Sequence, residues 1–150
     1  MRILIDGDHC PIRIKKICHD LSNTYHVQAY CFYEENFDLD DPDDEPIEIP
    51  STPSIPGRVD YRLSSLVTRR DIIITHDDDL ATILYPQVLA VIHPAGFVYN
   101  SQNIDQLLYK RYMIRKVHNP GKNKKARIKK RSFTEEFLFK QVLTDYIKPF

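Results

Sequence analysis

Three consecutive isoleucines, Ile72 to Ile74, limit the possible folds of this 150-residue chain more than any other feature. A run that is apolar at every position is typical of a strand covered on both faces, as when helices lie on each side of a parallel sheet. Apolar runs at 3–5 and 88–92 and an aromatic-rich run at 27–33 predict further strands, and 97–99 predicts a brief one.

Helices are predicted between these strands, because apolar residues there recur every three or four positions. Such segments follow Pro11, begin at Val59 and Leu80, and span about 101–117. Ser132 and Glu135 form a capping box for a last helix. Its expected apolar stripe comprises Phe133, Phe137, Leu138, Val142 and Tyr146. The alternation predicts an α/β three-layer sandwich with a mainly parallel central sheet.

Length and composition predict a single domain over residues 1–150, since the chain is too short for two independent cores. Its three cysteines form neither an even set nor a Cys-x-x-Cys pair, which argues against a disulfide framework and a thiolate zinc site. The first strand and its acids begin at once, without the apolar stretch of a signal peptide or membrane span. We therefore expect a cytoplasmic protein with no membrane partner.

Charge is sorted along the chain although the net charge is zero. Residues 34–48 hold nine acids and no base, within an expected surface loop at about 34–57 that carries five prolines. Residues 110–131 hold eleven bases and no acid, the pattern expected of a phosphate-binding segment. A solvated loop, or bases that neutralise the acidic loop, is the alternative. The candidate nucleic-acid contacts are Arg111, Arg115, Lys122, Lys124, Lys125, Arg127, Lys129, Lys130 and Arg131.

Acidic residues follow two of the predicted strands, where open α/β sheets form their ligand crevice. Asp6 and Asp8 come after the first strand, Asp77 and Asp79 come after the isoleucine strand, and Asp60 opens the preceding helix. Clustered carboxylates repel one another unless a cation offsets the charge, and Mg²⁺ and Mn²⁺ prefer oxygen ligands. These five acids are therefore candidate metal ligands. Helix capping by Asp77 to Asp79 is the structural alternative.

Several motifs together resemble the bacterial YaiI/YqxD family. They are Asp6-Gly7-Asp8-His9-Cys10-Pro11, Ile74-Thr75-His76-Asp77 with Leu80-Ala81, and Pro94-x-Gly96 before Tyr99. The resemblance covers about residues 1–33 and 58–118 and implies a PIN-like fold. In similar nuclease domains the matching acids, here Asp6, Asp8, Asp60 and Asp77, bind divalent metal. His76, Asp78, Asp79 and His93 depart from the family's usual residues.

The leading hypothesis is a metal-dependent nuclease that hydrolyses phosphodiesters, with RNA favoured and with Asp6, Asp8, Asp60 and Asp77 as catalytic residues. His9, His76 and His93 fall near strand ends, where a histidine can assist the metal or the leaving group. A nucleic-acid-binding module without catalysis is the first alternative. A phosphatase that uses Asp6 as nucleophile and Asp8 as acid and base is the second.

Overall fold

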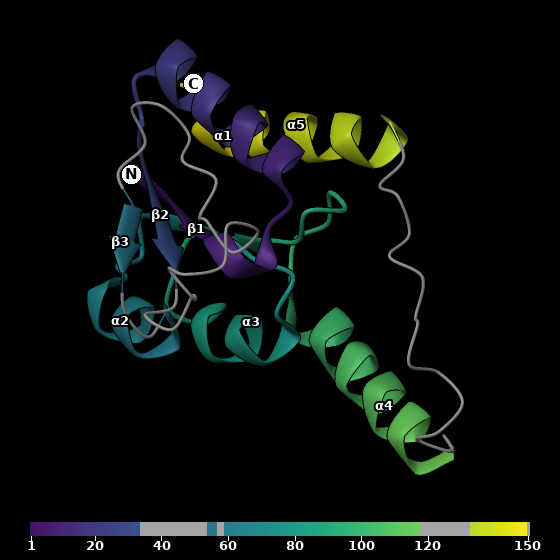
Figure 1. The fold of residues 1–150 in the computed structure, drawn as a ribbon. Helices are drawn as coiled ribbons and strands as arrows, with labels where there is room; N and C mark the ends of the chain where they lie inside the picture. The colour runs from purple at the N-terminus through teal and green to yellow at the C-terminus, as the bar shows by residue number, and fades with distance from the viewer. Residues whose placement is uncertain (34–53, 57–58, 118–132, 150) are drawn as a thin grey trace, which may run out of the picture.

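Five strands form one parallel sheet in the part of the chain that the structure describes (Figure 1). This computed structural model describes residues 1–33, 54–56, 59–117 and 133–149, without the side chains of 54–56, 59–61 and 117. The strand order is β3-β2-β1-β4-β5, and every ladder between neighbours is parallel. The strands are β1 (Arg2–Asp6), β2 (Gln28–Tyr33), β3 (Ser54–Pro56), β4 (Asp71–Ile74) and β5 (Ala90–Ile92).

Helices cover both faces of this sheet. The helices are η1 (Gly7–His9, a 3-10 turn), α1 (Ile12–Tyr25), α2 (Val59–Leu66), α3 (Asp78–Leu84), α4 (Ser101–Val117) and α5 (Phe133–Ile147). Figure 1 shows α1 and α5 above the sheet, with α2 and α3 below it. The predicted α/β three-layer sandwich is therefore confirmed, and its described strands are all parallel.

The core follows the alternation of side chains along each strand. Ile3, Ile5, Ile72 and Ile74 pack on the face covered by α1 and α5. Leu4 and Ile73 point the other way and pack with residues from α2, α3 and the first turn of α4. All three isoleucines of β4 are completely buried, as expected for a strand with helices on both sides.

Two expectations about strands differ from the structure. Residues 54–56, which we expected in the surface loop, pair with β2 as the edge strand β3. Residues 97–99 make only one antiparallel bridge, between Ile92 and Val98. The rest of the predicted acidic loop, residues 34–53 and 57, lies outside the described residues.

The buried face of α5 also differs from the predicted stripe. Phe133, Phe137 and Leu138 are exposed, whereas the residues that enter the core are Phe139, Leu143 and Ile147. These three recur every four residues and pack with α1 and one face of the sheet. The prediction was therefore wrong for Phe133, Phe137 and Leu138, whereas Val142 and Tyr146 of the predicted stripe are half-buried against the same core cluster. Several apolar rows run along this helix, and the sequence does not indicate which row meets the sheet.

A buried ion pair ties the starting ends of β1 and β4 together. Asp71 accepts hydrogen bonds from Arg2 Nε at 2.9 Å and from Arg2 Nη2 at 2.6 Å, and its side chain is 1% exposed. Asp71 Oδ2 also accepts the backbone N–H of Thr68 at 2.7 Å. Burial alone would raise the pKa of Asp71, but the hydrogen bonds from Arg2 and Thr68 outweigh it and lower the pKa.

Within the described residues, no helix combines the length and the apolar character needed to cross a membrane.

Candidate metal centre

The acidic site lies where the direction of chain travel through the sheet reverses. From β1 the chain proceeds to β2 and β3 on one side, and β4 and β5 then lie on the other side. Open α/β sheets bind ligands at such a switch point, beyond the carboxyl ends of the strands. The register pairs Ile5 with Ile74, so Asp6 at the end of β1 lies beside Thr75, which follows β4.

Asp6 is a buried carboxylate with two differently used oxygens. Its Oδ2 accepts a hydrogen bond from Thr75 Oγ1 at 2.8 Å and lies 3.0 Å from His9 Nδ1. Its Oδ1 is buried without a hydrogen-bond partner among the described residues, although the residue is only 1% exposed. A buried oxygen without a partner is costly, which suggests that a ligand outside the protein chain satisfies it.

The tight turn η1 brings His9 back over Asp6. Gly7 makes this turn possible, because a Cβ atom there would lie 2.6 Å from Cε1 of Tyr33 and 2.7 Å from the carbonyl oxygen of Phe32. The carbonyl oxygen of His9 then accepts the backbone N–H of His76 at 3.0 Å. The loops after β1 and β4 are thereby joined directly.

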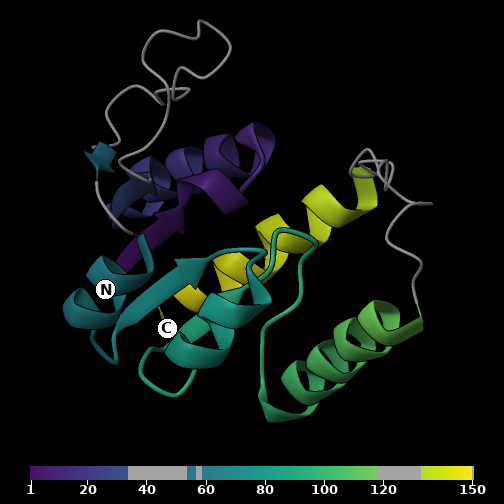
Figure 2. The same cartoon turned by 60° about the horizontal axis from the view of Figure 1, so that its bottom comes forward.

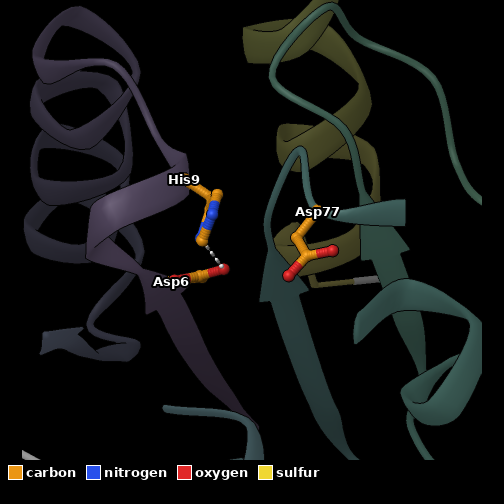
Figure 3. A group of neighbouring side chains, drawn as sticks. All are labelled: Asp6, His9 and Asp77. Atoms are coloured by element: carbon orange, nitrogen blue, oxygen red, sulfur yellow. Dashed lines mark hydrogen bonds and ion pairs between the residues drawn. The ribbon is translucent and has the colours of Figure 1, made fainter. Parts of the chain in front are cut away.

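Asp77 reaches the same site from the loop after β4. Its Oδ1 caps α3 by accepting the backbone N–H groups of Asp79 at 3.0 Å and Leu80 at 3.3 Å. Both capping bonds end on Oδ1, which leaves Oδ2 for a ligand. Figure 3 shows the Asp77 carboxylate facing Asp6 and His9 across the gap between the two loops. Capping and site formation are therefore compatible roles for this residue.

Asp6, His9 and Asp77 form a group whose ligand atoms all lie within 4.8 Å of one another. Divalent ions of the Mg²⁺ and Mn²⁺ kind bind carboxylate oxygens, and first-row transition metals also accept imidazole nitrogen. Asp6 Oδ1 is also buried without a hydrogen-bond partner among the described residues. The residues present therefore fit a divalent cation.

The electrostatics of the site are dominated by its acids. The hydrogen bond to Asp6 raises the pKa of His9 to about 9, against the opposing effect of partial burial, and the charges of Asp6, Asp77 and Asp8 add to the rise. In the metal-free protein His9 is therefore mostly protonated near neutral pH and supplies a positive charge to this acidic site. A bound metal ion would displace the proton from His9 and would itself supply the positive charge.

A row of rings extends from the site. The ring centres of His9 and His76 are 5.1 Å apart, those of His76 and His93 are 6.5 Å apart, and His93 stacks on Phe97 at 4.4 Å. The three histidines that the sequence placed near strand ends therefore form one row, which begins at His9 of the candidate metal group.

The other predicted ligands lie outside this group. Asp8 is exposed on η1. Asp79 pairs with Arg111 at 3.1 Å and has a side chain that is 67% exposed. Asp60 lies in the first turn of α2, and its side chain is outside the described part of the chain. Asp78, another acid that follows the isoleucine strand, accepts a hydrogen bond from Tyr99 Oη at 2.7 Å.

Two of the predicted phosphate-binding residues, Arg111 and Arg115, lie on α4. Arg111 pairs with Asp79 on α3, the helix that Asp77 caps, and Arg115 is exposed one turn further along α4. The remaining seven residues fall outside the described residues: Lys122, Lys124, Lys125, Arg127, Lys129, Lys130 and Arg131.

His9 was not among the metal ligands predicted from the sequence, although the prediction placed it near the end of the first strand as a residue that can assist the metal. The signal was the spacing Asp6-x-x-His9, because two residues three apart lie on the same side of a 3-10 turn. The presence of Gly7 between them was the further sign that the chain turns tightly there.

Together the fold and the site define a class: an α/β protein with a group of potential metal ligands beyond the carboxyl ends of a parallel sheet. Comparisons with known proteins then give the family. A family model described as "Uncharacterized BCR, YaiI/YqxD family" matches residues 4–149. The chain belongs to the YaiI/YqxD family, as its motifs predicted.

Relatives in Staphylococcus aureus agree with this assignment. A UPF0178 protein from strain bovine RF122 / ET3-1 is 36% identical over 135 residues, which cover 79% of this chain and 77% of that protein. A UPF0178 protein from strain Newman is 35% identical with the same coverage. No solved structure matches the chain.

Proposed function

We propose that this protein is a divalent-metal-dependent nuclease that hydrolyses phosphodiester bonds, with RNA as the favoured substrate. The observation that carries the proposal is the group of Asp6, His9 and Asp77 at the switch point, with the buried Asp6 Oδ1 lacking a partner in the described chain. These residues come from two separate loops, at the edge of the sheet where open α/β folds bind their ligands.

The donor set bears on which ion is held. Two carboxylates suit Mg²⁺ and Mn²⁺ alike, whereas an imidazole nitrogen is a better ligand for first-row transition metals than for Mg²⁺. We therefore favour Mn²⁺ over Mg²⁺ at this site. When bound, such an ion activates a water molecule and stabilises the charge that develops on a phosphodiester.

The protein's own groups hold and position the reacting parts. Thr75 fixes Asp6 Oδ2 by hydrogen bonding, and α3 fixes Asp77 through its cap. Arg111 and Arg115 lie four residues apart on α4, about 6 Å along the helix axis, so both can contact phosphates of one strand. Arg111 forms an ion pair with Asp79, and Asp79 lies two positions after Asp77 in the chain.

The alternative phosphatase mechanism receives less support from the geometry. An aspartate nucleophile must present a carboxylate oxygen to the substrate phosphorus. Asp6 is 1% exposed, its Oδ2 is engaged by both Thr75 and His9, and its Oδ1, although it has no partner among the described residues, is buried as well. The nucleic-acid-binding module without catalysis remains the alternative that the experiment below separates.

Calorimetric titration with MnCl₂ and MgCl₂ tests the metal site directly. We expect the native protein to bind Mn²⁺ more tightly than Mg²⁺, and Asp6→Asn and Asp77→Asn to abolish measurable binding of both. Asp105→Asn is the matched control, because Asp105 is an exposed acid on α4 outside the group. Circular dichroism checks that each variant is folded.

Cleavage of an end-labelled single-stranded RNA, followed with and without Mn²⁺, tests the reaction. Metal-dependent cleavage that is lost in Asp6→Asn and retained in Asp105→Asn would support the nuclease. RNA binding with Mn²⁺ binding but no cleavage would select the binding module. If native protein binds no Mn²⁺ even with RNA present, the metal-enzyme proposal is wrong.

A further inference from the structure

The second half of α4 carries exposed tyrosines among basic residues. Tyr109 is 65% exposed and Tyr112 is 56% exposed. Residues 109–117 include four bases and no acid: Lys110, Arg111, Arg115 and Lys116. In Figures 1 and 2 this part of the helix extends away from the sheet.

The tyrosines and the bases lie on adjoining parts of the helix surface. Residues three or four apart are neighbours on a helix, so Tyr112 adjoins Tyr109 on one side and Arg115 and Lys116 on the other. Lys116 Nζ lies 5.4 Å from the centre of the Tyr112 ring, in cation–π range. The aromatic ring therefore already sits beside positive charge.

We infer that this half of α4 binds single-stranded nucleic acid. Nucleobases stack on Tyr112 and Tyr109, and Arg111, Arg115 and Lys116 bind the phosphates. This inference rests on the nucleic-acid part of the proposed function and adds which surface makes the contact. Proteins that hold single strands combine exposed aromatic rings with neighbouring cations, because every unpaired base offers a face for stacking. A duplex keeps its bases stacked internally and offers the tyrosines far less.

Charge complementarity favours a nucleic acid over a protein on this surface. A protein partner that packed its own apolar residues on Tyr109 and Met113 would also have to neutralise the adjacent lysine and arginine side chains. A polyanion satisfies the cations and the rings at once. The position also agrees with this occupant, because Arg111 pairs with Asp79 on α3, the helix that Asp77 of the candidate metal group caps.

Fluorescence anisotropy tests the inference without relying on catalysis. Native protein in buffer with EDTA is titrated into a fluorescein-labelled single-stranded oligouridylate and into a blunt RNA duplex of equal length. We expect tighter binding to the single strand. Tyr112→Ala should weaken binding by at least about fivefold, and Tyr112→Phe should retain it, because the ring and not the hydroxyl stacks.

Phe137→Ala is the matched control. Phe137 is an aromatic residue that is 60% exposed on another helix, α5, so its loss should leave binding unchanged. Repeating the titrations at higher salt should weaken native protein and Tyr112→Ala alike, since the phosphate contacts remain in both.

Three results would overturn the inference: no single-strand binding at low salt, equal binding of single strand and duplex, or unchanged binding by Tyr112→Ala. If sedimentation shows that native protein is a dimer and that Tyr112→Ala is a monomer, the surface would instead bind a second copy of the chain. Because Mn²⁺ is absent throughout, this test is independent of the cleavage test. RNA binding that depends on Tyr112 without any cleavage would support the inference and contradict the nuclease, whereas cleavage with RNA binding that does not depend on Tyr112 would do the reverse.

Discussion

Thr75 and Asp6 are joined by a buried hydrogen bond although they lie 69 positions apart in the chain. Thr75 Oγ1 donates a hydrogen bond to Asp6 Oδ2 at 2.8 Å, and Thr75 Oγ1 also accepts one from the backbone N–H of Asp77 at 3.0 Å. One hydroxyl therefore connects the two carboxylate residues of the candidate metal centre and sets the spacing between their loops.

We expect Thr75→Val to weaken Mn²⁺ binding by about tenfold, since outer groups that orient metal ligands typically have this effect. The buried partners left without the hydroxyl should also lower the free energy of unfolding by about 1–2 kcal/mol. Calorimetry and urea denaturation measure the two effects. Thr75→Ser keeps the hydroxyl and should bind Mn²⁺ as native protein does; a Thr75→Val variant with native affinity would contradict the assignment.

The titration of His9 reports the Asp6–His9 contact in metal-free protein. Because its folded pKa is raised to about 9 from a usual value near 6.5, the contact stabilises the fold fully below about pH 6.5. This contribution is then lost as the pH rises through about 9. An NMR titration should show the raised pKa, and Asp6→Asn should lower it.

Asp145→Asn serves as the control for this titration, because Asp145 is an exposed acid on α5. It should leave the His9 curve unchanged. A native His9 that titrates near 6.5 would mean that the contact with Asp6 does not persist in solution.

Arg2 should matter to stability far more than an exposed arginine. Arg2→Ala leaves Asp71 buried without its partner, which we expect to cost about 3 kcal/mol of unfolding free energy. Because the folded pKa of Asp71 is lowered, the pair's contribution is present above about pH 4 and is lost as the pH falls through the folded pKa. Urea denaturation at several pH values measures both.

Arg13→Ala is the comparison for Arg2→Ala. Arg13 pairs with Glu136 at 3.2 Å but has a side chain that is 74% exposed, so its loss should cost less than about 1 kcal/mol. Equal costs for the two variants would show that burial of Asp71 does not strengthen its dependence on Arg2.

Gly7→Ala should disturb the site through packing alone. The added Cβ would meet the backbone carbonyl of Phe32 as well as the Tyr33 ring, so η1 must shift at a cost of about 1–3 kcal/mol. A shift of η1 moves His9 away from Asp6. We expect weaker Mn²⁺ binding in a folded variant, measured by calorimetry with circular dichroism as the folding control. Native stability and affinity in this variant would contradict the tight fit.

The sequence predicted the centre of the fold better than its edges. The isoleucines of β4 admit few alternatives, because a completely apolar triplet must be covered on both sides. By contrast, β3 has only three residues, and it becomes a strand through pairing with β2 rather than through a pattern of its own. The buried face of α5 depended likewise on tertiary packing.

The candidate site could be predicted in part. Strand ends indicated Asp6 and Asp77, since parallel strands bring their carboxyl ends to one edge. Nothing in the sequence indicates that the side chains of Asp8 and Asp79 are exposed on the surface outside the group. His9 joined the group because of a backbone turn, which residue spacing only hinted at.

The divided use of the Asp77 oxygens has an evolutionary consequence. An asparagine at position 77 would keep an oxygen to cap α3 while removing the negative charge, and one nucleotide substitution is enough to exchange aspartate for asparagine. Position 6 offers no comparable exchange, because an amide nitrogen buried there would need an acceptor. Under the proposed function, a descendant that lost catalysis would therefore be expected to change first at position 77 and to stay well folded.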